Sequence, residues 1–543
     1  MMEIIRDVNE YDNISSRDVI GNSKYFAEQR SFERNFATYS LADKKIQLQK
    51  WSEAKKYFAG MGGVPVSWNK PKNTVAIDCS DSHTLIIGPT GSKKSRLVVM
   101  PTVKVLTEAK ENMIISDPKA EIYNRTAQGL MEKGYKTYVL NLRDPEYGSA
   151  WNPLTIPYKF YCDGNIDRAY EFVNDIAINL VALDGASQDP FWDNSAGTLF
   201  FGLTILLFKY CKDYNIDERY VHIGNVFRLR NIMCSGNTVK VQNSPLWNYA
   251  KTDDFITSSL IGTIETANDT RAGILSVFDQ KMRAFAIQPN LLNMLSSNDI
   301  TLDEIEEKPT AIFLIMPDEK TSYHGLVSLF IKQSYEYIIF KVQSRLALEN
   351  QMRHIRVNYI LDEFSSLPQI KDFPAMITAA RSRNIRFNIV VQSKHQLQLR
   401  YAEEADTIQA NCNNWIFLSS KELKLLQELS TLCGEKYDGR GSRPILPIDK
   451  LQRLNKFKGE ALILSGRHKP YIARLADINE YDKEKFIILP LKKRKNTKKD
   501  IKLEFDLPDK YNNSLYSELK NIHINNFHNI IEKYQKMDNK EGE

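Results

Sequence analysis

Short apolar runs of strand length occur in two separate parts of this chain, with helical stretches between them. The first part contains the runs Leu85–Ile87, Asn112–Ser116 and Thr137–Leu142. The second part contains the runs Thr310–Met316, Arg356–Leu361, Phe387–Gln392 and Trp415–Ser419. Strands that alternate with helices are typical of a parallel sheet with crossover helices. The pattern therefore predicts an α/β fold with a mostly parallel sheet.

The segment between these two parts has the periodicity of helices. Apolar residues recur three or four positions apart from about Asp163 to Met294. We expect an all-α domain at residues 163–300, inserted between the two parts of the α/β domain at 76–162 and 301–490. The most apolar run of the insertion, Ala196–Phe208, is shorter than the roughly 20 residues that a membrane-spanning helix needs. We therefore predict that this run is a buried helix.

Both ends of the chain differ in composition from the α/β domain. Residues 1–75 form an N-terminal segment in which Ala42–Phe58 has helical spacing. Residues 491–543 form a polar C-terminal tail that starts with the basic run Leu491–Lys499 and contains one expected helix at Leu515–Tyr534. A solvated tail and an electrostatic contact with nucleic acid or anionic lipid both remain open for the basic run.

The composition is that of a soluble protein with several structural units. The chain has 543 residues, of which 42% are hydrophobic and 26% charged, and its length exceeds what one hydrophobic core covers. The net charge of +6 suits a polyanionic partner without demonstrating one. Six scattered cysteines without C-x-x-C spacing argue against a disulfide framework or a metal site, and favour a reducing cytosol. The first ten residues lack the apolar core of a signal peptide.

A glycine-containing loop joins the first apolar strand to a helical stretch. In such a loop the backbone amides and the helix N-terminus face an anion. We expect Lys94 to reach the β- and γ-phosphates of a nucleotide and Ser95 to hold Mg²⁺. Lys93 stands where the phosphate-loop pattern has its second glycine, and an ordinary strand-to-helix turn with two solvated lysines is the alternative. The candidate cofactor-binding residues are Gly88, Pro89, Thr90, Gly91, Ser92, Lys93, Lys94 and Ser95.

Charged residues also follow the strand at Asn112–Ser116. Asp117 and Lys119 come directly after this strand, where open α/β sheets bind ligands. We therefore add both to the candidate cofactor-binding residues. A plain helix start with Asp117 as its cap is the alternative.

Two adjacent acids end the strand at Arg356–Leu361. Neighbouring residues of a strand point to opposite sides, so Asp362 and Glu363 have different expected tasks. We expect Asp362 to hold Mg²⁺ through water, and Glu363 to orient and deprotonate the water that attacks the γ-phosphate. Gln392 ends the next strand, where its amide can sense the γ-phosphate. Arg381 and Arg383 are candidate arginine fingers toward the nucleotide of a neighbouring subunit, with solvated helix-end arginines as the alternative.

Taken together and in order, these motifs resemble those of the coupling proteins of conjugative type IV secretion systems, over about residues 75–480. Members of that family are ATPases that bring DNA and its attached relaxase to the transfer channel. The motifs that carry the resemblance are Gly88–Ser92, Asp117–Glu121, Phe191–Asp193, Leu361–Phe364, Ala380–Arg383 and Val391–Leu397.

The resemblance implies a RecA-like P-loop nucleotide domain with an inserted all-α domain that reads the substrate. It also implies a homo-hexamer with ATP and Mg²⁺ between subunits and single- or double-stranded DNA in its channel. The expected partners are a relaxase, the type IV secretion channel and a membrane-anchoring protein that recruits this cytoplasmic chain to the inner face of the membrane. Because Lys93 replaces the family's glycine, a nucleotide-binding adaptor with little or no hydrolysis is the alternative function. A coupling protein for effector proteins is another.

Overall fold

The computed structural model describes most of the chain between residues 29 and 494. The described residues are 29–33, 35–47, 62–181, 189–234, 242, 245–303, 305, 308–317, 319, 323–348, 355–437, 441–466, 468–482 and 486–494. Those up to 151 and from 298 onward form one compact unit, and those from 152 to 297 form a second. The expected helix at Leu515–Tyr534 lies outside the described residues.

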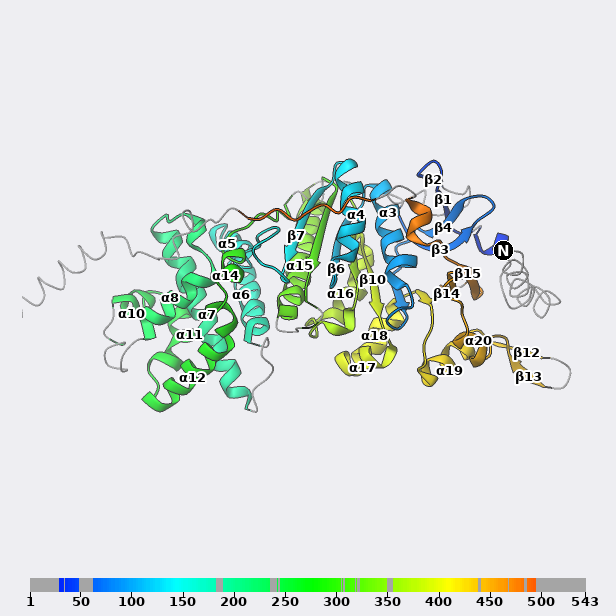
Figure 1. Ribbon diagram of the computed structural model, residues 1–543. Coiled ribbons are helices and arrows are strands. Elements are labelled where there is room, and N and C mark those ends of the chain that lie inside the picture. The colour runs from blue at the N-terminus through cyan, green and yellow to red at the C-terminus, as the bar shows by residue number, and fades with distance from the viewer. Residues whose placement is uncertain are drawn as a thin grey trace, which may run out of the picture. The chain divides into compact units, whose positions relative to one another are not determined.

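The first unit is built on a nine-stranded sheet with the order β15-β14-β11-β5-β10-β9-β6-β8-β7 (Figure 1). Neighbouring strands from β11 to β7 are parallel, whereas β14 pairs antiparallel with both β11 and β15. The predicted mostly parallel α/β fold is confirmed, although the antiparallel edge was not foreseen. The strands are β5 (Thr84–Ile87), β6 (Asn112–Asp117), β7 (Lys136–Asn141), β8 (Thr310–Ile315), β9 (Val357–Leu361), β10 (Ile385–Val391), β11 (Asn414–Phe417), β14 (Glu460–Ser465) and β15 (Tyr471–Arg474).

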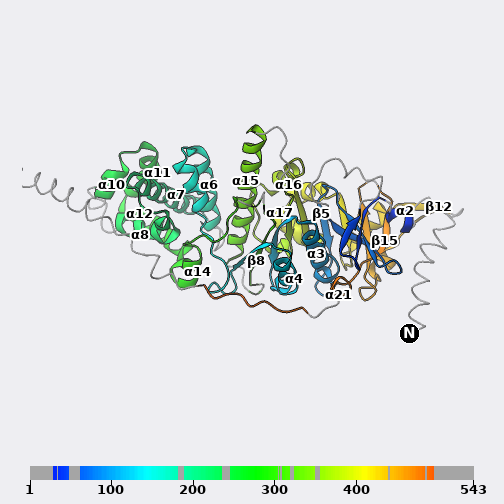
Figure 2. The same ribbon diagram turned by 90° about the horizontal axis from the view of Figure 1, so that it is seen from above.

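Helices cover both faces of this sheet, which explains why its central strands are buried and mostly apolar. Figure 2 shows α3 (Met100–Ala109) and α4 (Glu121–Glu132) on one side, and α15 (His324–Leu348) and α16 (Phe373–Ala380) on the other. Every residue of β10 is buried. The further helices of this unit are α2 (Gln29–Glu33), the 3-10 turns η8 (Phe364–Ser366) and η9 (Arg381–Arg383), α17 (Lys394–Tyr401), α18 (Glu404–Asn411), α19 (Leu423–Leu432), α20 (Ile448–Gln452) and α21 (Ile478–Tyr481).

A four-stranded antiparallel sheet forms the N-terminal part of the first unit, in the order β2-β1-β4-β3. The helix predicted for Ala42–Phe58 is wrong where the structure describes it, because β2 pairs there with β1 instead. Residues 48–58 of that prediction lie outside the described part. The strands are β1 (Ala37–Ser40), β2 (Lys45–Gln47), β3 (Val64–Asn69) and β4 (Thr74–Asp78), and a separate hairpin is formed by β12 (Glu435–Tyr437) and β13 (Ser442–Pro444).

The second unit is all-helical where the structure describes it, and its helices pack around α7 (Pro190–Asp213). Among the described residues, α7 is the helix whose length and apolar composition would allow it to cross a membrane, and 56% of its most apolar window is buried. The helix is longer than the run Ala196–Phe208 from which it was predicted. The other helices are α5 (Thr155–Cys162), α6 (Ile166–Val181), η6 (Glu218–Tyr220), α8 (Ile223–Cys234), α10 (Pro245–Ala250), α11 (Asp254–Ile264), α12 (Asn268–Lys281), α13 (Arg283–Ala286) and α14 (Pro289–Met294).

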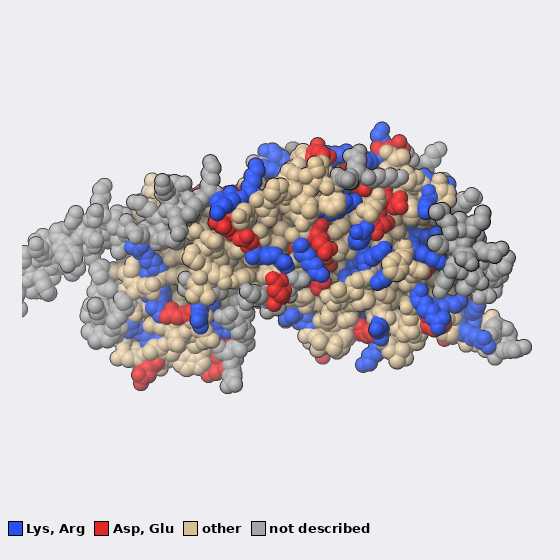
Figure 3. All heavy atoms as spheres, viewed as in Figure 1, with Lys and Arg blue, Asp and Glu red and all other residues tan. Residues whose placement is uncertain are grey.

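Surface charge on the first unit is mixed in sign. Figure 3 shows Lys and Arg side chains interspersed with Asp and Glu on the face that it displays. Within the basic run predicted as a possible contact surface, Lys493 pairs with Glu146 at 2.8 Å. Residues 495–499 of that run lie outside the described part of the chain. All six cysteines are free.

A buried charge cluster joins the amino ends of β6, β9 and β10. The fully buried carboxylate of Glu111 lies 3.9 Å from the Arg356 guanidinium and 3.6 Å from that of Arg386. It also accepts hydrogen bonds from the Gly62 amide and the Asn358 side chain, each at 2.9 Å. These contacts fix the ends of the strands relative to one another.

Replacing Glu111→Ala should strongly destabilise the protein. The substitution leaves two buried arginines without their compensating charge, which costs about 3–5 kcal/mol. Urea unfolding followed by circular dichroism measures this loss. The matched control is Glu108→Ala, which breaks a surface pair with Lys133 at 2.7 Å and should cost at most about 1 kcal/mol. Equal unfolding midpoints for the two variants would contradict the role of the cluster.

Candidate functional site

The loop after β5 has the backbone of a phosphate-binding turn. The Gly88 amide donates to the Val391 carbonyl at 3.2 Å, which ties the loop to the end of β10. Gly91 and Lys93 have φ values of +79° and +68°. For a residue with a side chain, this left-handed conformation costs roughly 1–2 kcal/mol. The left-handed backbone at position 93 explains why the phosphate-loop pattern has a glycine there. Lys93 adopts this conformation at the stated cost.

Lys94 lies folded back over this loop. Its ammonium group donates to the Gly88 carbonyl at 2.6 Å and to the Pro89 carbonyl at 3.4 Å. Burial lowers the pKa of Lys94, and the nearby carboxylates of Asp362 and Glu363 oppose this shift. The loop thus holds a buried cation next to two acids.

Asp362 connects the end of β9 to the start of the loop helix, the helical segment η4 (Ser95–Val99) that follows the phosphate-binding loop and continues into α3. Its carboxylate accepts a hydrogen bond from the Ser95 hydroxyl at 3.3 Å and one from the Glu363 amide at 3.0 Å. Ser116, which the sequence did not single out, donates to the Asp362 carbonyl at 2.8 Å. Burial raises the pKa of Asp362 to about 6, although Lys94 opposes the shift. The structure therefore brings together Ser95 and Asp362, the two residues expected to hold a metal ion.

Glu363 and Gln392 face each other beside this pair. Glu363 has a φ of +54°, and its carboxylate accepts hydrogen bonds from Gln392 at 2.8 Å and from Ser366 at 3.4 Å. Because β9 and β10 are parallel neighbours, their carboxyl ends meet at the same edge of the sheet. The amide of Gln392 thus orients the Glu363 carboxylate.

Asp117 is buried at the end of β6 and also holds the start of α4. Its carboxylate accepts a hydrogen bond from the Tyr123 amide at 2.8 Å. Burial raises the pKa of Asp117 to about 7, against the effect of its backbone hydrogen bonds. Asp117 therefore bonds an amide of the first turn of α4, as the helix-start alternative expected, although the cap residue itself is Ala120. Asp117 lines the candidate site as well.

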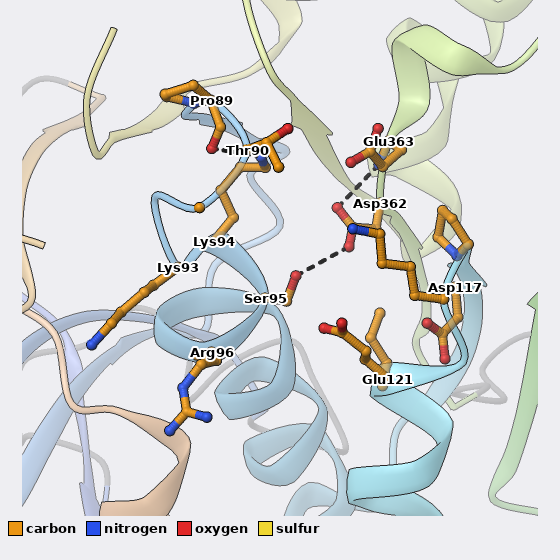
Figure 4. Close-up of a pocket in the computed structure, with 14 residues that line it drawn as sticks. Pro89, Thr90, Lys93, Lys94, Ser95, Arg96, Asp117, Glu121, Asp362 and Glu363 are labelled. Carbon is orange, nitrogen blue, oxygen red and sulfur yellow. Dashed lines mark hydrogen bonds between the residues drawn. The ribbon is translucent and has the colours of Figure 1, made fainter. Parts of the chain in front are cut away.

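Lys94, Ser95, Asp117, Asp362 and Glu363 line one cavity of about 340 Å³, a size suited to a small ligand, whereas Gln392 does not line it. Figure 4 shows Asp362 and Glu363 on one side of the loop helix, and Glu121 pointing toward Ser95. Arg96, Glu121 and Ile122 were not singled out from the sequence, although Glu121 belongs to the noted motif after β6. The lining residues are Pro89, Thr90, Gly91, Lys93, Lys94, Ser95, Arg96, Asp117, Pro118, Lys119, Glu121, Ile122, Asp362 and Glu363.

Gly88 and Ser92 do not line the cavity but shape its loop. A Cβ at position 88 would come within 2.5 Å of the Ser92 hydroxyl, so a side chain there would have to displace Ser92. The Lys93 side chain points away from Lys94 and the two acids (Figure 4). Its ammonium lies 5.2 Å from the centre of the Phe457 ring. Lys93 therefore leaves the space between Lys94 and Asp362 open.

Arg381 and Arg383 lie away from this cavity. Both precede β10, so they lie at the amino end of the strand whose carboxyl end carries Gln392. Arg381 pairs with Asp81 at 3.1 Å, and Arg383 donates to the Ala379 carbonyl at 2.8 Å. Neither arginine reaches the site of its own chain.

A family model described as Type IV secretory system Conjugative DNA transfer matches residues 39–437. The chain belongs to this family. The predicted resemblance to the conjugative coupling proteins is thereby confirmed. Protein VirD4 of Rhizobium rhizogenes is 20% identical to this chain over 361 residues, which cover 65% of the chain and 49% of VirD4. The chain thus spans about half the length of the curated relatives that it matches.

Solved structures of the conjugative coupling protein TrwB share the fold. The trigonal form of TrwBdeltaN70 with sulphate has a TM-score of 0.53 and 15% identity, covering 76% of this chain and 87% of that one. TrwB in complex with ADP and Mg²⁺ has a TM-score of 0.50 and 15% identity, covering 77% and 88%. The RecA-like P-loop fold expected for this type IV secretion family member is therefore confirmed.

In this family member, Asp362→Asn should change the dependence of stability on pH. Because the pKa of Asp362 lies near 6 in the folded state and near 3.8 ordinarily, the folded protein binds more protons than the unfolded one between these values. Its stability therefore falls as pH rises through this window. The variant should be more stable than the native protein by about 1–3 kcal/mol at pH 7.5 and equally stable near pH 4. Urea unfolding at both pH values measures this.

The control for this experiment is a carboxylate whose pKa is shifted in the opposite direction. Although burial opposes it, hydrogen bonds from Arg96 and the Asn479 amide lower the pKa of Asp477. Asp477→Asn should therefore reduce stability at pH 7.5. Equal stability of Asp362→Asn and the native protein at pH 7.5 would show that the charged Asp362 carboxylate does not destabilise the folded protein.

Proposed function

We propose that this protein is the coupling ATPase of a conjugative type IV secretion system, which uses ATP hydrolysis to recruit relaxase-bound DNA to the transfer channel and help pump it. The observation that carries the proposal is the hydrogen bond between Ser95 and Asp362 in a cavity that Lys94 and Glu363 also line. These are the groups that a phosphate-binding loop and its acidic partner strand need for ATP and Mg²⁺.

The donor set suits both parts of the ligand. Hydroxyl and carboxylate oxygens, as on Ser95 and Asp362, are the ligands that Mg²⁺ prefers. When bound, the ion would neutralise charge between the β- and γ-phosphates. Lys94, now held by loop carbonyls, would exchange those contacts for phosphate oxygens. The complex of TrwB with ADP and Mg²⁺ supports the same assignment for this chain.

Glu363 is the proposed general base. Its carboxylate would accept the proton of the attacking water, and Gln392 would hold it in the orientation seen at 2.8 Å. Asp117 and Lys119 would complete the phosphate side of the cavity that they line.

Arg381 and Arg383 would act on a neighbouring subunit of a homo-hexamer. The pair of Arg381 with Asp81 is exposed, so little free energy opposes its exchange for a phosphate. In this proposal the protein works at the cytoplasmic face of the membrane, with the secretion channel, a membrane-anchoring protein, a relaxase and single- or double-stranded DNA as partners. Membership of the conjugative DNA transfer family supports this set of partners.

Two other functions compete with this one. The left-handed backbone at Lys93 favours an adaptor that binds nucleotide but hydrolyses it slowly or not at all. The helical unit is equally compatible with protein effectors as cargo. Capture of a relaxase by the full chain would favour DNA transfer over effector secretion.

Lys94→Ala and Glu363→Gln should each abolish transfer of a mobilisable plasmid. Glu363→Gln should still bind ATP, because the amide keeps its size, but its hydrolysis should fall by about 10²–10⁴ without a general base. Conjugation frequency, ATP binding and phosphate release measure these effects. Glu404→Gln, an exposed substitution on α18, is the control and should transfer normally. Wild-type transfer by either site variant would refute the coupling function.

Lys93→Gly should change steady-state ATP hydrolysis by less than about tenfold. The reason is that the Lys93 side chain points away from the acids, and relief of the strained backbone is worth only roughly 1–2 kcal/mol. Phosphate release with and without single-stranded DNA measures turnover of both proteins. Native turnover at background, rescued by Lys93→Gly, would establish the adaptor instead of the motor.

A further inference from the structure

Phe457 presents an exposed aromatic ring directly beside the phosphate-binding loop. Phe457 is 79% exposed, which is the largest exposed fraction of any phenylalanine in the described part of the chain. The Lys93 ammonium lies 5.2 Å from its ring centre and the Lys456 ammonium 5.3 Å. The exposed fraction shows that most of the ring remains accessible to a ligand although both cations lie near it.

The loop that carries this ring is held in place. Lys456 donates to the Gly91 carbonyl at 3.2 Å, which fastens it to the phosphate-binding loop. The Asn455 side chain accepts hydrogen bonds from the Phe457 amide at 2.9 Å and from the Lys458 amide at 3.2 Å. The Asn455 amide in turn donates to Glu460 at 2.8 Å. The position of the ring relative to the cavity is therefore fixed by the chain itself.

The order of strands places this ring opposite the acids. Asp362 directly follows β9, which lies on one side of β5, whereas Phe457 precedes β14, which lies on the other side. Figure 4 likewise shows Lys93 and Arg96 directed away from Asp362 and Glu363. Of a nucleotide whose terminal phosphate lies at Lys94 and Asp362, the end away from these residues would therefore be the end nearer to Phe457.

We propose that Phe457 is the stacking platform for the nucleobase of the bound nucleoside triphosphate. This inference rests on the proposed function, since it assigns the base end of the same ligand. Base stacking on an aromatic ring requires only a π-face and no hydrogen bond. Lys93 and Lys456, next to the ring, contribute positive charge toward the sugar-phosphate end of the ligand.

This placement gives Lys93 a task that a glycine could not perform. The left-handed backbone at position 93 directs the side chain to the Phe457 ring and away from the cavity. The departure from the phosphate-loop pattern then belongs to recognition of the nucleoside, and the groups that contact the terminal phosphate stay unchanged.

Calorimetry with two ligands tests the proposal on the full chain. Mg²⁺-ATP carries a base, whereas Mg²⁺-tripolyphosphate carries only the phosphates. Phe457→Ala should weaken ATP binding about tenfold, as loss of one stacked base does elsewhere, and leave tripolyphosphate binding unchanged. Phe457→Trp should restore ATP binding, and ATP but not tripolyphosphate should quench the added fluorescence.

The matched control is Phe486→Ala. This ring is 42% exposed and carries the Arg125 guanidinium at 4.1 Å from its centre, but it is not next to the phosphate-binding loop. Its removal should change neither affinity. If Phe457→Ala weakens the binding of both ligands equally, the residue only stabilises the loop. If it weakens the binding of neither ligand, the ring contacts no nucleotide. Both results overturn the platform while the proposed function stands. Failure of the native protein to bind either ligand overturns both.

Discussion

The contact between Ser95 and Asp362 is the interaction on which the candidate site depends. The two residues are 267 positions apart in the chain, and the strands that precede them are separated in the sheet by β10. Their hydrogen bond forms only when three parallel strands end at the same level. The site is therefore a consequence of sheet register, and any slip of β9 against β10 would move Asp362 away from the loop.

The buried charges at the carboxyl ends of the parallel strands differ in kind from those at the amino ends. At the carboxyl edge, burial raises the pKa of both Asp117 and Asp362, so the folded chain holds acids whose charged forms are unfavourable there. Such strain is common where a site awaits a charged ligand. At the amino edge, Glu111 lies between two arginines and fixes the same strands. The ion-paired cluster at the amino ends thus fixes the strands whose carboxyl ends hold the buried acids.

Lys93 shows how a departure from a motif can leave its chemistry intact. The backbone keeps the left-handed conformation that glycine adopts most easily, at a cost that is small against the stability of a domain. The Lys93 ammonium lies against the Phe457 ring. This ring belongs to a separate loop before β14, which lies on the opposite side of β5 from β9. Substitution at this position therefore redirects a positive charge without filling the cavity.

Much of this protein could be predicted from local sequence. The apolar strands, the mostly parallel fold and the acids at strand ends follow from periodicity and the chemistry of short motifs, because these depend on neighbouring residues. The helix predicted at Ala42–Phe58 is wrong at β2, since pairing with β1 overrides the local pattern. The antiparallel edge of the large sheet, the contact of Gln392 with Glu363, and the ring of Phe457 beside Lys93 were decided by tertiary structure. They join residues far apart in the chain, and such contacts depend on how strands and loops pack in space.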